Sequence, residues 1–125
     1  KVEVEYLIAL SNEKSINDLP PFSKDEQERL RKIYQNFNLV GAEKVKEIEA
    51  TTNHDVKAIE YYIQGKVKKS LHPWIHFALT SEDVNNLSYS LMWQDGLKQV
   101  YQSSLQSVNK RLKKLARKYK EASML

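Results

Sequence analysis

Toward its C-terminal end the chain carries an apolar pattern that only a long helix can display. Six apolar or aromatic residues follow one another there at alternating steps of four and three: Tyr101, Leu105, Val108, Leu112, Leu115 and Tyr119. Such a heptad pattern, kept for nearly three heptads, lines one side of a helix and requires another helix to pack against. We therefore expect this segment to belong to a helical bundle.

The rest of the chain repeats the helical spacing in shorter stretches. No stretch alternates apolar and polar residues as a strand does, and the 125 residues include only three glycines and three prolines. The sequence therefore predicts an all-α fold with a modest core. The residues expected on buried helix faces are Val4, Leu7, Ile8, Leu10, Leu30, Ile33, Tyr34, Phe37, Val45, Ile48, Val56, Ile59, Ile63, Val67, Val84, Leu87 and Leu91.

Turn and cap signals separate these helices. Two consecutive prolines keep residues 15–22 out of a helix, Gly41 is expected to end the next helical unit, and Pro73 breaks a later stripe. A hydroxyl residue followed three positions later by an acid is the spacing of a capping box. This spacing marks three helix starts: Ser23 with Glu26, Thr52 with Asp55, and Thr80 with Asp83.

Composition excludes several kinds of site and partner. The absence of cysteine excludes disulfides and thiolate metal sites and is compatible with a reducing compartment. The longest apolar runs are far shorter than a membrane span. The net charge of +4 comes mainly from a basic cluster in the last helix, which we interpret as a solvated helix face and not as a nucleic-acid or membrane-binding patch. The basic residues of this cluster are Lys110, Arg111, Lys113, Lys114, Arg117, Lys118 and Lys120.

Two polar segments, residues 51–55 and 74–86, each open a helical stretch. Each places hydroxyls, an amide and a histidine around a helix N-terminus. Such an end offers free backbone N–H groups and the positive end of the helix dipole, both of which favour an anion. The two segments together indicate a site for an anionic ligand.

The same residues also have structural interpretations. Capping needs only one hydroxyl, so of Thr80 and Ser81 one is free for a ligand. His54 beside a cap and His76 between apolar neighbours are, on the residues alone, more often structural, although Asp55 would fix the tautomer of His54 and favour a cationic ring. The three histidines do not favour zinc, because no pair is spaced four apart on a helix.

These segments also resemble known signatures. Residues 51–58, Thr-Thr-Asn-His-Asp-Val-Lys-Ala, resemble the first signature of adenylosuccinate lyases, and Ile-His-Phe at 75–77 with Thr-Ser-Glu-Asp-Val-Asn-Asn-Leu-Ser at 80–88 resembles the second. The similarity runs from about Lys1 to Leu125, and the spacing of the signatures fits. The sequence is thus similar to the adenylosuccinate lyase family of the fumarase/aspartase superfamily.

The resemblance implies a cofactor-free β-elimination. These enzymes release fumarate from adenylosuccinate, giving AMP, and from the succinylated aminoimidazole carboxamide ribotide of purine biosynthesis. The resemblance implies no metal site and a nucleotide substrate. It gives substrate-binding roles to Thr52, Asn53, His54, Asp55, His76, Thr80 and Ser81.

The resemblance also implies that residues 1–80 form an N-terminal helical domain and that residues 81–125 begin a central helical bundle. The family's general acid, a histidine in an Arg-Thr-His-Gly-Gln-like motif, would come just after Leu125, and its general base, a serine on a mobile loop, further on. We therefore expect a fragment that has no catalytic residue and is inactive alone. The full-length enzyme would be a cytoplasmic homotetramer without nucleic-acid or membrane partners.

Two other interpretations remain open. Another lyase of the superfamily, such as an argininosuccinate lyase or a fumarase, would share the Thr-Ser pair, although residues 51–55 argue against it. A non-enzymatic interaction module would use the basic helix to bind a partner. The residues that follow Leu125 would distinguish an enzyme from such a module.

Overall fold

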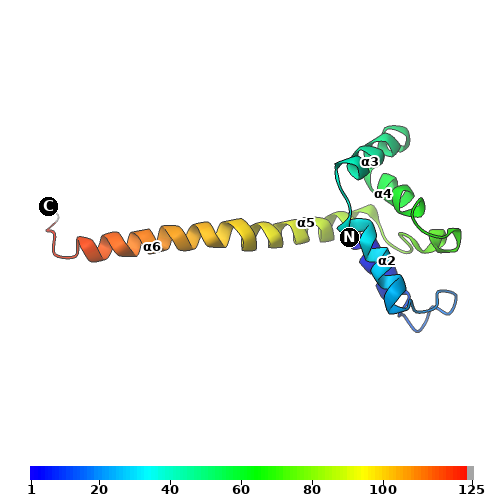
Figure 1. The fold of residues 1–125 in the computed structure, drawn as a ribbon, viewed down its shortest axis with the longest axis horizontal. Coiled ribbons are helices and arrows are strands. Elements are labelled where there is room, and N and C mark those ends of the chain that lie inside the picture. The colour runs from blue at the N-terminus through cyan, green and yellow to red at the C-terminus, as the bar shows by residue number, and fades with distance from the viewer. Residues whose placement is uncertain (124–125) are drawn as a thin grey trace. The chain divides into compact units, whose positions relative to one another are not determined.

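The computed structural model describes residues 1–123, and all regular structure within them is helical (Figure 1). This confirms the predicted all-α fold. None of the described helices is both long and apolar enough to cross a membrane. The elements are α1 (Val2–Leu10), α2 (Lys24–Gln35), α3 (Leu39–Thr52), α4 (Asp55–Gln64), the 3₁₀-helix η1 (Lys69–Trp74), α5 (Ser81–Gly96), the π-helix η2 (Leu97–Tyr101) and α6 (Gln102–Lys118).

The chain divides into two compact units. The N-terminal unit comprises Lys1–Ser88, and the C-terminal unit begins at Tyr89. The division expected between residues 80 and 81 concerns the domains of a longer enzyme and stays a prediction. All the candidate site residues belong to the N-terminal unit.

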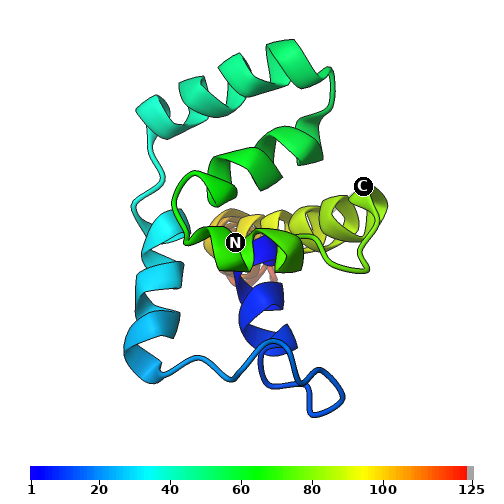
Figure 2. The same cartoon turned by 90° about the vertical axis from the view of Figure 1, so that its right-hand side faces the viewer.

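Helix α1 supplies the centre of the hydrophobic core. Its four predicted core residues, at positions 4, 7, 8 and 10, are buried, and Leu7 is fully inaccessible to solvent. Leu30 of α2, Ile63 of α4 and Ile75 pack into the same cluster. Helix α1 lies against α2, and α3 lies along α4 (Figure 2). The apolar stripes of α2 and α4 thus meet around α1, as helical periodicity predicts. The prediction that Leu87 of α5 lies on a buried face is wrong, because this residue is 53% exposed.

Two of the three predicted capping boxes are present. Ser23 and Glu26 form the complete box at the start of α2. At the start of α5 the Thr80 backbone N–H donates to Asp83 Oδ2 over 2.7 Å, and the Asp83 N–H donates to Thr80 Oγ1 over 3.3 Å. Both boxes depend only on residues three apart, which explains why the sequence suffices to predict them.

The predicted box of Thr52 and Asp55 is wrong. The N-cap of α4 is His54, whose Nδ1 accepts the backbone N–H of Lys57 over 3.3 Å. The reason is that α3 continues to Thr52 and ends at Asn53, which adopts the left-handed conformation (φ 50°). The Thr52 hydroxyl donates to the His54 carbonyl instead.

The prediction that Gly41 ends a helix is also wrong. Gly41 lies in the first turn of α3, where its N–H donates to the side chain of the N-cap Asn38. A Cβ at this position would lie 2.8 Å from the Tyr62 hydroxyl and 3.1 Å from the Phe37 ring. The glycine therefore permits the close approach of α3 to Tyr62 of α4.

Two predicted stripes extend beyond their helices. Phe37 follows the end of α2 and is 44% exposed, while its ring contacts Tyr62 edge-on. Val67 follows the end of α4 and still packs on the core. Both side chains reach their apolar neighbours from outside a helix. The apolar spacing alone therefore predicted helices longer than those observed.

The junction of α1 and α2 carries a hydrogen-bonded ion pair. Arg31 donates to both carboxylate oxygens of Glu5 over 2.8 and 2.9 Å, and the Tyr34 hydroxyl donates to the same carboxylate over 2.8 Å. The hydrogen bond from Arg31, followed by the one from Tyr34, lowers the pKa of Glu5 against the opposing effect of burial. The folded state thus binds a proton at Glu5 less readily than the unfolded state.

Replacing Glu5 by Gln should lower the free energy of unfolding by about 1 kcal/mol near neutral pH, because the pair is partly exposed and screened. Since the pKa is lowered on folding, this stabilisation is present above the ordinary Glu pKa of about 4.3 and is lost as the pH falls through the folded value. Urea unfolding at about pH 7 and about pH 2.5 measures the difference. The exposed Glu47 of α3, changed to Gln, is the control. An equal loss for Glu5→Gln at both pH values would contradict the assignment.

Candidate functional site

The structure brings His54 and Ser81 together, although they are 27 positions apart in the sequence. The Ser81 hydroxyl lies 3.4 Å from His54 Nε2. His54 is the N-cap of α4, and Ser81 is the first residue of α5. Two helix N-termini therefore present a hydroxyl and an imidazole nitrogen at one place, as an anion site requires.

The two neighbouring hydroxyls at the start of α5 have different partners. Thr80 Oγ1 donates to Asp83 Oδ2 over 2.7 Å, and the hydrogen bonds from the Thr80 side chain and backbone lower the pKa of Asp83. Ser81 takes no part in this cap, and His54 is its side-chain partner. Only Thr80 therefore caps this helix through its side chain, and the binding of a ligand by Ser81 stays a prediction.

His54 offers an N–H at Nε2 in either protonation state. In the neutral ring Nδ1 accepts the Lys57 N–H, so the proton lies on Nε2. In a protonated ring Nδ1 would donate to Asp55 Oδ1, which lies 3.4 Å away, and Nε2 would still carry its hydrogen. The nitrogen that faces Ser81 is thus a donor in both states, and 47% of the His54 side chain is exposed to a ligand.

Three residues that flank this pair have a left-handed backbone. Asn53 precedes His54, and His76 (φ 62°) and Ala78 (φ 56°) precede Thr80. Asn53 is the C-cap of α3, where asparagine adopts this conformation readily, whereas for His76 and Ala78 it costs roughly 1–2 kcal/mol. The surrounding contacts must supply that energy, and such backbone strain is typical of functional sites.

His76 has other polar partners than His54 and Ser81. Its Nδ1 is 2.7 Å from Glu3 Oε1, and its Nε2 is 3.8 Å from Glu60 Oε1. The second carboxylate oxygen of Glu60 pairs with Lys57 Nζ over 2.7 Å. The ring is 14% exposed and the two acids are nearly inaccessible, so both ring nitrogens face buried carboxylates.

Sequence reasoning missed Glu3 and Glu60. Each lies at helical spacing from core residues: Glu3 lies four before Leu7, and Glu60 lies three before Ile63. A charged residue on an apolar stripe is the signal that would have found them, because a buried charge needs a partner. The identity of that partner is set by tertiary structure.

A metal site does not form among residues 1–123, where no group of three or more histidines and carboxylates is placed to hold an ion. Glu3 and Glu60 approach opposite nitrogens of the His76 ring and so do not converge on one point. Of the remaining candidates, Thr52 is the last residue of α3, Asn53 follows it, and Asp55 is the first residue of α4, next to His54.

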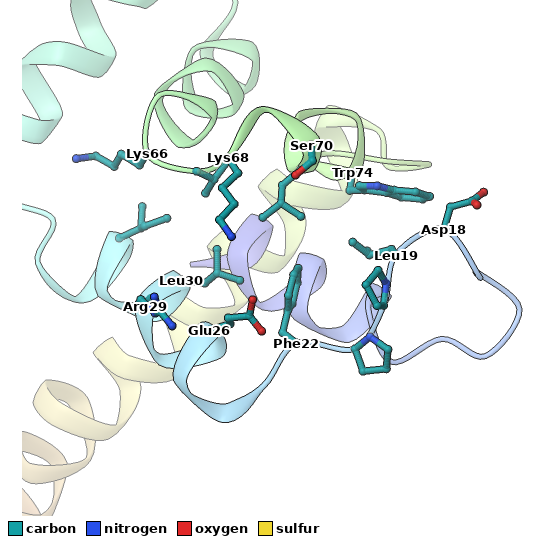
Figure 3. A pocket seen from close by; sticks show the side chains of 15 residues that line it. Asp18, Leu19, Phe22, Glu26, Arg29, Leu30, Lys66, Lys68, Ser70 and Trp74 are labelled. Carbon is teal, nitrogen blue, oxygen red and sulfur yellow. The ribbon is translucent and has the colours of Figure 1, made fainter.

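A pocket of about 410 Å³ opens elsewhere in the N-terminal unit, beside α2 and η1 (Figure 3). Its apolar wall includes Phe22 and Trp74, and Figure 3 shows the side chains of Lys68 and Glu26 extending toward each other across it. None of the candidate site residues lines this pocket. Acidic and basic side chains both face it, so its charge does not select an anionic ligand.

A family model and several known proteins match this chain over nearly its whole length. A family model described as lyase matches residues 2–125. Adenylosuccinate lyase of Haemophilus influenzae is 40% identical over 129 residues, which cover 99% of this chain and 28% of that protein. The enzymes of Dictyostelium discoideum and Escherichia coli K12 are each 38% identical over the whole chain and 28% of their own length. The chain thus spans little more than a quarter of these relatives.

Proposed function

Because the chain belongs to the lyase family, we propose that it forms part of an adenylosuccinate lyase and contributes to the binding of its substrate. The observation that supports this role best is the approach of the Ser81 hydroxyl to His54 Nε2 between two helix N-termini. We infer adenylosuccinate as the substrate because the chain is similar to adenylosuccinate lyases over its length.

The proposed reaction is a β-elimination without a cofactor. A base removes a proton from the carbon beside a carboxylate, and the carbanion is stabilised by charge delocalised onto that carboxylate. The C–N bond then breaks, an acid protonates the departing nitrogen, and fumarate is released from AMP. The substrate carries one phosphate and two carboxylates, so donors at helix N-termini have anionic oxygens to bind.

In this proposal, His54 and Ser81 bind and orient the substrate. His54 Nε2–H donates to an anionic oxygen, and the Ser81 hydroxyl and the free backbone N–H groups of α5 donate to the same or a neighbouring oxygen. Asp83 also carries negative charge at the start of α5, but the two hydrogen bonds that Thr80 donates hold its carboxylate at the cap. The two donors therefore select for an anion at the start of α5.

Replacing His54 by Ala in the full-length enzyme should remove a charge-assisted contact worth about 1.5–3 kcal/mol, which corresponds to a loss in kcat/KM of roughly 10- to 150-fold. Ser81→Ala should remove a neutral contact and lower kcat/KM by roughly 2- to 12-fold. Steady-state cleavage of adenylosuccinate, followed by absorbance, measures both.

Ser70→Ala is the matched control, because this serine lines the separate pocket of Figure 3. It should keep wild-type kinetics. Near-wild-type kinetics for both His54→Ala and Ser81→Ala would refute the proposed role. Turnover of argininosuccinate, or hydration of fumarate, in place of adenylosuccinate cleavage would assign the chain to another lyase of the superfamily.

A further inference from the structure

The His76 ring joins two buried acids from different helices. Glu3 comes from α1 and Glu60 from α4, and their side chains are 2% and 7% exposed. Two carboxylates buried at this depth require cationic or hydrogen-bonding partners. Lys57 is the cationic partner of Glu60, and the His76 ring is the hydrogen-bonding partner of Glu3. The other nitrogen of the ring faces Glu60.

The contacts of His76 connect to the pair of His54 and Ser81. Glu60, which faces His76, pairs with Lys57 Nζ, and the backbone N–H of the same Lys57 donates to His54 Nδ1. His54 Nε2 approaches Ser81, and only four residues of the chain separate His76 from Ser81. The contacts and this short segment therefore link His76 to the candidate pair along two routes.

Helix α1 holds the segment from 76 to 80 at two points. Glu3 binds the His76 ring, and the Tyr6 hydroxyl donates to the Phe77 carbonyl over 2.9 Å. Residues three apart lie on one face of a helix, so Glu3 and Tyr6 reach the segment from the same side of α1. The left-handed residues His76 and Ala78 lie within or next to these contacts.

We propose that Glu3 and Glu60 are positioning residues of the lyase site, which act through His76 to place Ser81 against His54. The inference rests on the proposed function, since it assigns these acids to the same site. Neither acid contacts the candidate ligand position. Glu3 binds the His76 ring at Nδ1, and Glu60 faces Nε2 across 3.8 Å. In this proposal the two acids thereby stabilise the left-handed turn and fix where the start of α5 lies relative to the start of α4.

The test uses the full-length enzyme with Glu3→Gln and Glu60→Gln, which keep the side-chain size and remove the charge. Misplacement of the binding pair should raise KM for adenylosuccinate by about five- to tenfold. A loss of folded enzyme would lower the apparent kcat and leave KM unchanged. Glu49→Gln is the matched control, because Glu49 pairs with Lys46 at the same spacing and the same 2.7 Å distance on α3, and it should keep the wild-type KM.

Tyr6→Phe provides a milder variant if the buried acids prove necessary for folding. It removes only the hydrogen bond to Phe77 and should raise KM about two- to threefold. An unchanged KM in Tyr6→Phe and in every folded Gln variant would overturn the inference.

The crystal structures of wild type and Tyr6→Phe separate this inference from the proposed function. If the wild-type enzyme does not cleave adenylosuccinate, the proposed function fails, and the distance from Ser81 Oγ to His54 Nε2 still tests the positioning. A longer distance in the variant supports the inference, and a distance that is unchanged in Tyr6→Phe and in every folded Gln variant overturns it. If the wild-type enzyme is active and neither KM nor this distance changes, only the positioning fails.

Discussion

The 125-residue chain alone is expected to show no measurable cleavage of adenylosuccinate, while the full-length protein cleaves it. The family resemblance places the general acid in an Arg-Thr-His-Gly-Gln-like motif and the general base on a mobile serine loop, and the 125 residues contain no such motif. Each proton-transfer group contributes roughly 10²- to 10⁴-fold to a rate, so the loss of both removes detectable turnover.

The absorbance change on cleavage of adenylosuccinate measures this directly. Both proteins are compared at equal concentration, in preparations shown to be free of the host's own enzyme. Turnover by the 125-residue chain above background would contradict the assignment of its residues to substrate binding alone.

Leu112→Asp is expected to dissociate the full-length oligomer. The six residues of the heptad pattern are each between 44% and 59% exposed in the described part of the C-terminal unit. A contiguous apolar stripe of this length requires cover from other helices, which the resemblance places partly in another subunit. An aspartate in the middle of that contact would bury an unpaired charge.

Sedimentation at matched concentrations compares wild type with Leu112→Asp and with Gln106→Asp. The control adds the same charge next to the heptad position Leu105 but outside the pattern, and it should leave the oligomer intact. A wild-type monomer, or an unchanged oligomer in Leu112→Asp, would show that the heptad pattern is not the interface.

Local sequence signals predicted the helices and part of the caps correctly. The core residues of α1 and the boxes at Ser23 and Thr80 are confirmed, because each depends on spacing within one helix. The prediction of a capping box at Thr52 and Asp55 was wrong, because only Asn53 and His54 separate α3 from α4. The end of α3 therefore decides where α4 starts. The prediction that Gly41 ends a helix was wrong, because this glycine permits the close approach of Tyr62 from a neighbouring helix.

In the candidate site, too, the sequence predicted some residues, but contacts between distant segments had to come from the structure. The resemblance marked His54 and Ser81, and the structure places them 3.4 Å apart. The carboxylates around His76 were not predicted, because their pairing joins residues 73 positions apart in the sequence. The left-handed residues His76 and Ala78 likewise lie next to a contact with α1 that spacing does not reveal.

A crystal structure of the full-length protein with AMP and fumarate bound tests the central claim most directly. We expect anionic oxygens of the ligands to lie about 2.7–3.2 Å from both His54 Nε2 and Ser81 Oγ, with His76 still between Glu3 and Glu60. Ligands bound elsewhere, for example in the pocket beside Trp74, with His54 and Ser81 free of them, would contradict the account.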